Sequence, residues 1–141
     1  MFLESNLFQE KIEGAVLGFS VADALGVPVE FTPREERKLD PVCDMRGDSS
    51  HGQPTGTWSD DTSMALCVIH SLIEKGIDYE DQMSRFADWA ENANYTATGE
   101  VFDIGRATLH AISIFLHGKP ALKCGETSEN CTTSLIRIQA A

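Results

Sequence analysis

Apolar residues repeated at helical spacing constrain the fold of this chain more than any other feature. They recur three and four positions apart from Asn6 to Gly26, after Ser59 to a stop at Gly76, from Asp78 to Asn92, and from about Asp103 to Gly118. A short apolar piece at 134–138 is a candidate fifth helix. No segment shows the alternation of a strand. The sequence therefore predicts an all-α, multi-helix bundle.

The spacing also predicts which side of each helix is buried. The expected inward residues are Phe8, Ile12, Ala15, Val16 and Phe19; Ala65, Leu66, Ile69, Leu72 and Ile73; Met83, Phe86, Ala87 and Ala90; and Ile104, Ala107, Thr108, Ala111, Ile112 and Phe115. Gly14, Gly18 and Ala22 form a strip of small residues on the first helix, which favours close approach by another helix. Cys67 lies within an apolar run and is expected in the core.

Composition limits the classes of partner. The 141 residues fit one domain at most, and the 22 acidic against 11 basic side chains give a net charge of −11. That charge repels phosphate backbones, so we expect neither nucleic acid nor an anionic membrane as partner. No apolar run approaches the roughly 18 residues of a membrane span. The acidic start carries no secretory signal, and the four cysteines form no C-x-x-C pair, so reduced thiols in the cytoplasm are expected.

Four polar residues stand where a long irregular segment, 31–57, gives way to the second helix: Ser59, Asp60, Asp61 and Thr62. Loops this long within a small domain are typically functional or disordered. One interpretation of the neighbouring carboxylates is helix capping, helped by the helix dipole. The other is a hard divalent cation, because magnesium prefers carboxylate, hydroxyl and water oxygens. The four residues by themselves leave both open.

Four motifs, spread over nearly the whole chain, carry a resemblance to a known family. They are residues 14–18 with 22–31 (GAVLG, ADALGVPVEF), 56–66 (GTWSDDTSMAL), 95–99 with 102–105 (YTATG, FDIG), and 130–137 (NCTTSLIR). In this order and at these separations they resemble the motifs of the ADP-ribosylglycohydrolases, the family that includes the dinitrogenase reductase-activating glycohydrolase. The whole chain, 1–141, resembles the N-terminal part of one such domain.

The resemblance implies a fold of many packed helices, with two magnesium ions in a cleft that holds ADP-ribose. Ser59, Asp60 and Asp61 would be metal ligands, and Glu30 would act with the two aspartates as a catalytic carboxylate or ligand. The substrate-binding residues implied are Tyr95, Gly99, Asp103 and Ser134. From the residues alone, Asp103 is also a candidate cap of the fourth helix, and Asp23 a side chain that bonds locally.

The implied reaction is magnesium-dependent hydrolysis of the bond between ADP-ribose and a protein side chain, arginine or serine, or a small conjugate. The pattern departs from the family in three places. The mildest is Ala22-Asp23-Ala24, where the family has Gly-Asp-Ala. Thr132 and Thr133 stand where the family has a glycine-rich turn, and the second metal motif of the longer family members is absent from this truncated sequence. The alternative is therefore an inactive remnant or an ADP-ribose-binding module that needs a complementing chain, with self-association through exposed helix faces.

Overall fold

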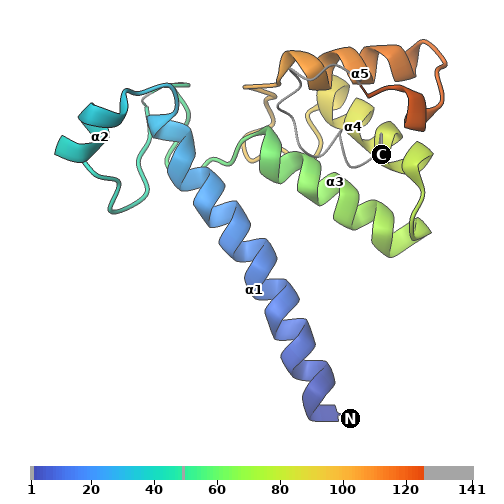
Figure 1. The fold of residues 1–141 in the computed structure, drawn as a ribbon, viewed down its shortest axis with the longest axis horizontal. Coiled ribbons are helices and arrows are strands. Elements are labelled where there is room, and N and C mark those ends of the chain that lie inside the picture. Colours follow the sequence, from blue (N-terminus) through green and yellow to red (C-terminus); the bar gives the residue numbers. More distant parts are fainter. Residues whose placement is uncertain (1, 49, 126–141) are drawn as a thin grey trace. The chain divides into compact units, whose positions relative to one another are not determined.

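The computed structural model describes residues 2–48 and 50–125, which form helices joined by loops (Figure 1). Along the chain these are α1 (Phe2–Gly26), η1 (Val27–Val29), α2 (Arg34–Leu39), α3 (Asp60–Lys75), α4 (Tyr79–Asn92), α5 (Arg106–Leu116) and η2 (Ala121–Lys123). Across the described ranges there is no β-strand, and the prediction of an all-α fold is confirmed. Ser134 and the candidate helix at 134–138 lie outside the described residues.

The chain divides into two compact units, residues 1–62 and residues 63–141. In the first unit, α1 continues directly into the 3-10 turn η1 (Figure 1). The buried apolar residues of this unit lie at that junction: Ala24, Val27 and Pro28. The short helix α2 lies in the segment that was expected to be irregular. It carries acids in its first turn and bases in its last, an order that the helix dipole favours.

The prediction that one face of α1 is buried was wrong. The side chains of Phe8, Ile12 and Phe19 are 68%, 50% and 45% exposed. A Cβ built on Gly14 or Gly18 would meet no described atom within 4 Å, so the expected close approach of a helix is not found there. Periodicity marks the side of a helix that is fit for burial, but burial also needs a partner, and the described part of residues 1–62 supplies one only at the end of α1.

The expectation that no stretch of this chain is apolar enough to span a membrane was too strict. The stretch Asn6–Val29 has a window of mean hydropathy 1.5 and is by length and composition apolar enough to cross a membrane. Uninterrupted apolar runs are short here, but valines and leucines keep the average high across Glu13 and Asp23. A core helix of a soluble protein passes the same test.

The second unit is built on a core shared by its helices. The buried residues of this hydrophobic core are Met64 and Cys67 of α3; Met83, Phe86, Ala87 and Trp89 of α4; Ala111 and Ile112 of α5; and Ala121 and Cys124 around η2. The predicted α4 face is confirmed, and so are the buried positions Thr108, Ala111 and Ile112 of α5. On α3 the prediction that Cys67 lies in the core is confirmed, but the predicted inward face was wrong in its orientation, because Leu72 and Ile73 are 45% and 78% exposed while Met64 is buried.

Local signals at the helix ends decide most boundaries of this unit. Asp78 caps α4, its carboxylate accepting the backbone N–H groups of Glu80 (3.0 Å) and Asp81 (3.1 Å), as expected. Asp103 does not cap α5, which begins later, with Gly105 as its N-cap. The physical reason is backbone conformation: an N-cap residue is normally extended, whereas Asp103 has a φ of 56°.

Candidate functional site

The carboxylate of Asp23, three residues before the end of α1, binds the start of α3. Its Oδ2 accepts the backbone N–H of Ser59 (3.0 Å), the backbone N–H of Thr62 (3.1 Å) and the Thr62 hydroxyl (2.5 Å). Its Oδ1 accepts the Ser59 hydroxyl at 2.7 Å. Asp23 therefore acts as a helix cap supplied from 36 residues away, and the interpretation that it bonds only locally was wrong.

This arrangement bears on the two interpretations of Asp60 and Asp61. Asp23 accepts two N–H groups at the start of α3, and the Ser59 hydroxyl oxygen accepts a third, from Asp61, at 3.3 Å. Capping bonds to these three amides therefore do not need the carboxylates of the two acids in the first turn. Asp60 is half-buried and Asp61 is exposed. The donor set of one hydroxyl and two carboxylates fits a magnesium ion, which prefers hard oxygen ligands.

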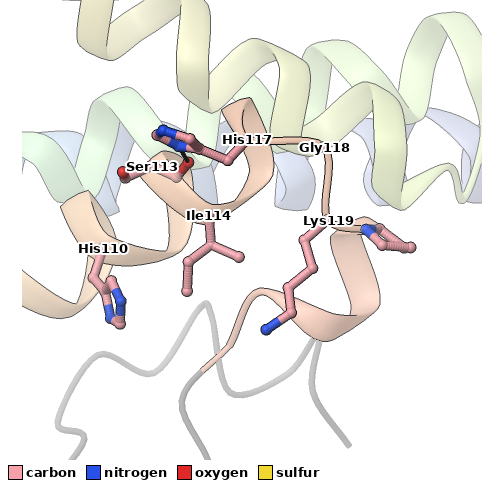
Figure 2. A pocket seen from close by; sticks show the side chains of 7 residues that line it. His110, Ser113, Ile114, His117, Gly118 and Lys119 are labelled. Carbon is pink, nitrogen blue, oxygen red and sulfur yellow. Dashed lines mark hydrogen bonds between the residues drawn. The ribbon is translucent and has the colours of Figure 1, made fainter.

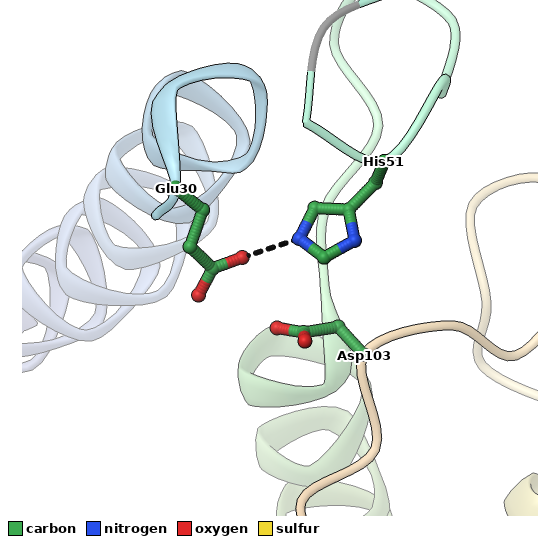
Figure 3. Close-up of side chains that lie close together, drawn as sticks. All are labelled: Glu30, His51 and Asp103. Atoms are coloured by element: carbon green, nitrogen blue, oxygen red, sulfur yellow. Dashed lines mark hydrogen bonds and ion pairs between the residues drawn. The ribbon is translucent and has the colours of Figure 1, made fainter. Parts of the chain in front are cut away.

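The carboxylate of Glu30 is held by the loop that returns past η1. His51 Nε2 lies 2.7 Å from Glu30 Oε2 (Figure 3). An ionised carboxylate only accepts, so the imidazole N–H donates in this bond. The Ser50 hydroxyl donates to the backbone carbonyl of Glu30 at 2.5 Å, and the ring of Phe31 stands edge-on to His51, with centroids 5.6 Å apart. Glu30 is thus anchored at both its main chain and its side chain.

Tyr95 lies at the end of an ion-pair network in the second unit. Arg85 Nε donates to Asp81 (2.6 Å), Nη2 to Glu74 (2.6 Å) and Nη1 to the Tyr95 hydroxyl (3.1 Å). The hydroxyl also lies 2.7 Å from His70 Nδ1. The Arg85 guanidinium lowers the pKa of both the Asp81 and the Glu74 carboxyl below their ordinary values. The network joins α3, α4 and the loop that follows α4.

The other residues predicted to bind substrate are Gly99, Asp103 and Ser134. Gly99 lies in the exposed loop after Tyr95 with a φ of 80°, a conformation that favours glycine, and its N–H donates to the Thr96 hydroxyl at 3.0 Å. Asp103 is half-buried in the segment before α5. Ser134 lies outside the described residues. The assignment of Tyr95, Gly99, Asp103 and Ser134 to substrate binding stays a prediction.

A pocket lies at the C-terminal end of α5 and contains none of the predicted site residues (Figure 2). It has a volume of about 480 Å³ and is lined by His110, Ser113, Ile114, His117, Gly118, Lys119 and Pro120. The His117 imidazole is already engaged, with Nδ1 2.7 Å from the Ser113 carbonyl one turn back. The pocket and the predicted site are therefore different features of the chain.

Sequence comparison shows the class of protein. The family model described as ADP-ribosylglycohydrolase matches residues 4–141, and the chain belongs to the ADP-ribosylglycohydrolase family. The resemblance of the four motifs is thereby confirmed. A solved structure titled ADP-ribosylglycohydrolase-related protein complex matches with a TM-score of 0.70 and 33% identity, covering 89% of this chain and 39% of that chain.

Two curated relatives are similar to most of this chain. The ADP-ribosylarginine hydrolase Tri1 of Pseudomonas putida (strain GB-1) is 35% identical over 108 residues, which are 76% of this chain and 28% of the relative. The ADP-ribosyl-[dinitrogen reductase] glycohydrolase of Rhodospirillum rubrum is 32% identical over 107 residues, 74% of this chain and 34% of the relative. The chain thus spans about a third of the length of these relatives.

Sequence reasoning missed four side chains that hold the predicted site residues in place: Asp23, His51, His70 and Arg85. For Asp23 a signal existed, because it is the one charged residue between Gly14 and Val29, and a carboxylate in such an apolar stretch needs a donor. The i, i+4 spacing of Asp81 and Arg85 indicated their ion pair. Nothing local indicated that His51 would meet Glu30, since 21 residues separate them.

Proposed function

We propose that this chain forms part of a magnesium-dependent ADP-ribosylglycohydrolase site that cleaves ADP-ribose from arginine side chains. Family membership supports the class of reaction, and the printed name of the Pseudomonas putida relative supports arginine as the linked side chain. Serine linkage is the second substrate to test. The partner would be an ADP-ribosylated protein or a small ADP-ribose conjugate.

The observation that carries the proposal is the way the start of α3 is capped. Asp23 and the Ser59 hydroxyl accept the backbone N–H groups of Ser59, Asp61 and Thr62, so the adjacent acids Asp60 and Asp61 are not required for these bonds. Together with the Ser59 hydroxyl, these two carboxylates form a set of hard oxygen donors of the kind that magnesium prefers.

Ser59, Asp60 and Asp61 would hold the magnesium ion. A magnesium ion held there would supply positive charge close to the ribose and to the attacking water. Glu30, held by His51 at 2.7 Å, would accept a proton from the water that adds to the anomeric carbon of the ribose. The carbon–nitrogen bond breaks through an oxocarbenium-like state, and the leaving guanidine takes up a proton. Tyr95, Gly99, Asp103 and Ser134 would line the ADP-ribose subsite.

The test is release of ADP-ribose by the purified 141-residue chain. ADP-ribosylated arginine and serine peptides are incubated with and without magnesium, and free ADP-ribose is separated by chromatography. We expect magnesium-dependent release from the arginine peptide that is lost in the double variant Asp60→Asn, Asp61→Asn. Asp44→Asn is the matched control, because the exposed Asp44 carboxylate accepts the N–H of its own neighbour Met45 (2.8 Å), away from the motif.

A second candidate follows from the share of the relatives that the chain spans, 28% and 34%. ADP-ribose binding without turnover would support a binding module that needs a complementing chain for catalysis. Absence of both binding and turnover, with no response to magnesium, would refute both functions for this chain.

We also propose a cytoplasmic location. Its support is the cysteine chemistry: Cys43, Cys67 and Cys124 are all free thiols, as is usual in a reducing compartment. Fractionation of cells that express a tagged chain tests this, and recovery in a membrane or secreted fraction would contradict it.

A further inference from the structure

We infer that Asp23 is a positioning residue of the metal site. It sets the direction of the Ser59 O–H bond so that a lone pair of the hydroxyl oxygen points toward the cation. The inference rests on the proposed function, because it concerns how the proposed ligands are oriented. It assigns a role to a side chain that lies in α1, more than 30 residues away from the motif that it serves.

Four hydrogen bonds converge on the carboxylate of Asp23. Both oxygens of Asp23 are used, and every recorded partner belongs to Ser59 or Thr62, the residues on either side of Asp60 and Asp61. Two of the four bonds come from backbone N–H groups and two from hydroxyls. The turn that carries the two acids is therefore fixed at both of its ends by a single side chain.

The bond to Asp23 fixes the direction of the Ser59 hydroxyl proton. A serine hydroxyl has one proton, and the ionised Asp23 carboxylate can only accept, so this proton points at Asp23 Oδ1 across 2.7 Å. The Ser59 oxygen then presents only lone pairs elsewhere, one of which accepts the Asp61 N–H at 3.3 Å. A hydroxyl that ligates a cation needs this orientation. Partners that orient metal ligands typically change metal affinity 10- to 100-fold when they are replaced.

Asp23→Asn separates this role from simple capping. An asparagine can place its amide oxygen where Oδ2 now lies, which keeps the acceptor for the two N–H groups and for the Thr62 hydroxyl. Its NH₂ group then faces the Ser59 oxygen and donates to it. This reverses the bond, so the Ser59 proton must turn away from Asp23. Asparagine and aspartate cap helices about equally well, so little stability should be lost.

Asp78→Asn is the matched control. Asp78 also caps a helix through two backbone N–H groups, those of Glu80 (3.0 Å) and Asp81 (3.1 Å), but it lies at the start of α4 and outside the predicted metal ligands. Both variants remove one negative charge from a capping carboxylate. They differ in that only Asp23 accepts the hydroxyl of a proposed ligand.

The measurements are manganese affinity, by the loss of the free Mn²⁺ resonance signal on titration, and amide hydrogen exchange of Ser59 and Thr62 without metal. We expect Asp23→Asn to weaken Mn²⁺ binding about 10- to 100-fold while Asp78→Asn leaves it unchanged. Asp23→Ala should in addition remove the exchange protection of both amides. Equal Mn²⁺ affinity in wild type and Asp23→Asn, at full protection, would overturn the inference.

Failure of the proposed function has a different signature. A wild-type chain that binds no Mn²⁺ refutes the metal site, and with it the orienting role of Asp23 toward a cation. Exchange data then still decide whether Asp23 fixes the turn: unchanged protection of Ser59 and Thr62 in Asp23→Ala would remove that part as well.

Discussion

The hydroxyl of Tyr95 illustrates how closely neighbouring protons determine one another. Arg85 can only donate, so the Tyr95 oxygen accepts from Nη1, and the single Tyr95 proton is left for His70 Nδ1. In the tautomer that carries its proton on Nε2, Nδ1 accepts this bond and the Nε2–H group faces Glu74 Oε1 at 3.2 Å. The chain of bonds runs from guanidinium to hydroxyl to imidazole to carboxylate and fixes a loop residue whose φ is 65°.

Tyr95→Phe tests this chain of bonds. The ring is kept, while His70 and Arg85 each lose a partner, so we expect a loss of about 1 kcal/mol in the free energy of unfolding. Urea denaturation measures it. Tyr79→Phe is the control, because the described residues contain no hydrogen bond to the Tyr79 hydroxyl. Wild-type stability in Tyr95→Phe would show that the hydroxyl contributes nothing net, and binding of ADP-ribose by the same variant separates a structural from a ligand-binding use of the hydroxyl.

Cys67 and Cys43 should differ sharply in reactivity. Burial raises the pKa of the Cys67 thiol to about 12, whereas Cys43 is exposed. The thiolate is the reactive form, and at pH 8 almost none of Cys67 is ionised in the folded chain. We expect iodoacetamide to label the Cys43 peptide and to spare the Cys67 peptide until urea is added, as read by peptide mass spectrometry. Fast labelling of Cys67 in native buffer would contradict its place in the core.

At the scale of elements, α4 ends on a strained residue. Ala93, its C-cap, has a φ of 57° and donates its N–H to the Trp89 carbonyl at 2.9 Å. A residue with a Cβ pays roughly 1 kcal/mol or more for this left-handed conformation, whereas glycine adopts it freely.

Ala93→Gly should therefore stabilise the chain. The relief of strain is partly offset by the greater freedom of glycine in the unfolded state, so we expect a net gain of about 0.5 kcal/mol. The shift of the urea midpoint measures it. Ala90→Gly, in the helix interior, is the control and should lose about 1 kcal/mol. Destabilisation by Ala93→Gly would show that the αL conformation is not kept in solution.

The same helix shows what a sequence can predict. Both ends of α4 were predicted, at Asp78 and Asn92, because caps act within a few residues. On α3 the burial of Cys67 was predicted correctly and that of Leu72 was not, because the helices that pack against α3 decide which part of its apolar surface is covered. The start of α5 was misjudged because a positive φ at Asp103 cannot be seen in its neighbours.

The candidate site also has parts that the sequence predicts and parts that it does not. The motif around Asp60 and Asp61 was visible through its resemblance to a family, and the family is now shown. The groups that orient the motif were not visible, because the bond from Asp23 to Ser59 spans 36 residues and the one from His51 to Glu30 spans 21. Local sequence encodes caps and faces, whereas long-range partners depend on the packing that brings distant segments together.

At the scale of the whole molecule, charge is the dominant property. A net charge of −11 over 141 residues disfavours the compact state through self-repulsion. Local ion pairs such as Lys38–Glu35 at 2.7 Å act in the opposite sense, but exposed pairs like this one contribute little. Salt screens both, since the Debye length falls from about 30 Å at 0.01 M to about 8 Å at 0.15 M.

We therefore expect sodium chloride to raise the urea midpoint at pH 7 between 0.01 and 0.15 M. Magnesium chloride at equal ionic strength should raise it further, because binding to the folded state adds a stabilisation that grows with the ratio of free ion to dissociation constant. The excess of magnesium over sodium is the specific part, and it should vanish in the double variant Asp60→Asn, Asp61→Asn while the sodium effect persists. A midpoint that falls as sodium chloride is added would mean that local ion pairs outweigh the global repulsion. An equal response to both salts in the wild type would mean that magnesium acts on this chain only by screening, and that the two neighbouring acids at the start of α3 are tolerated without a bound cation.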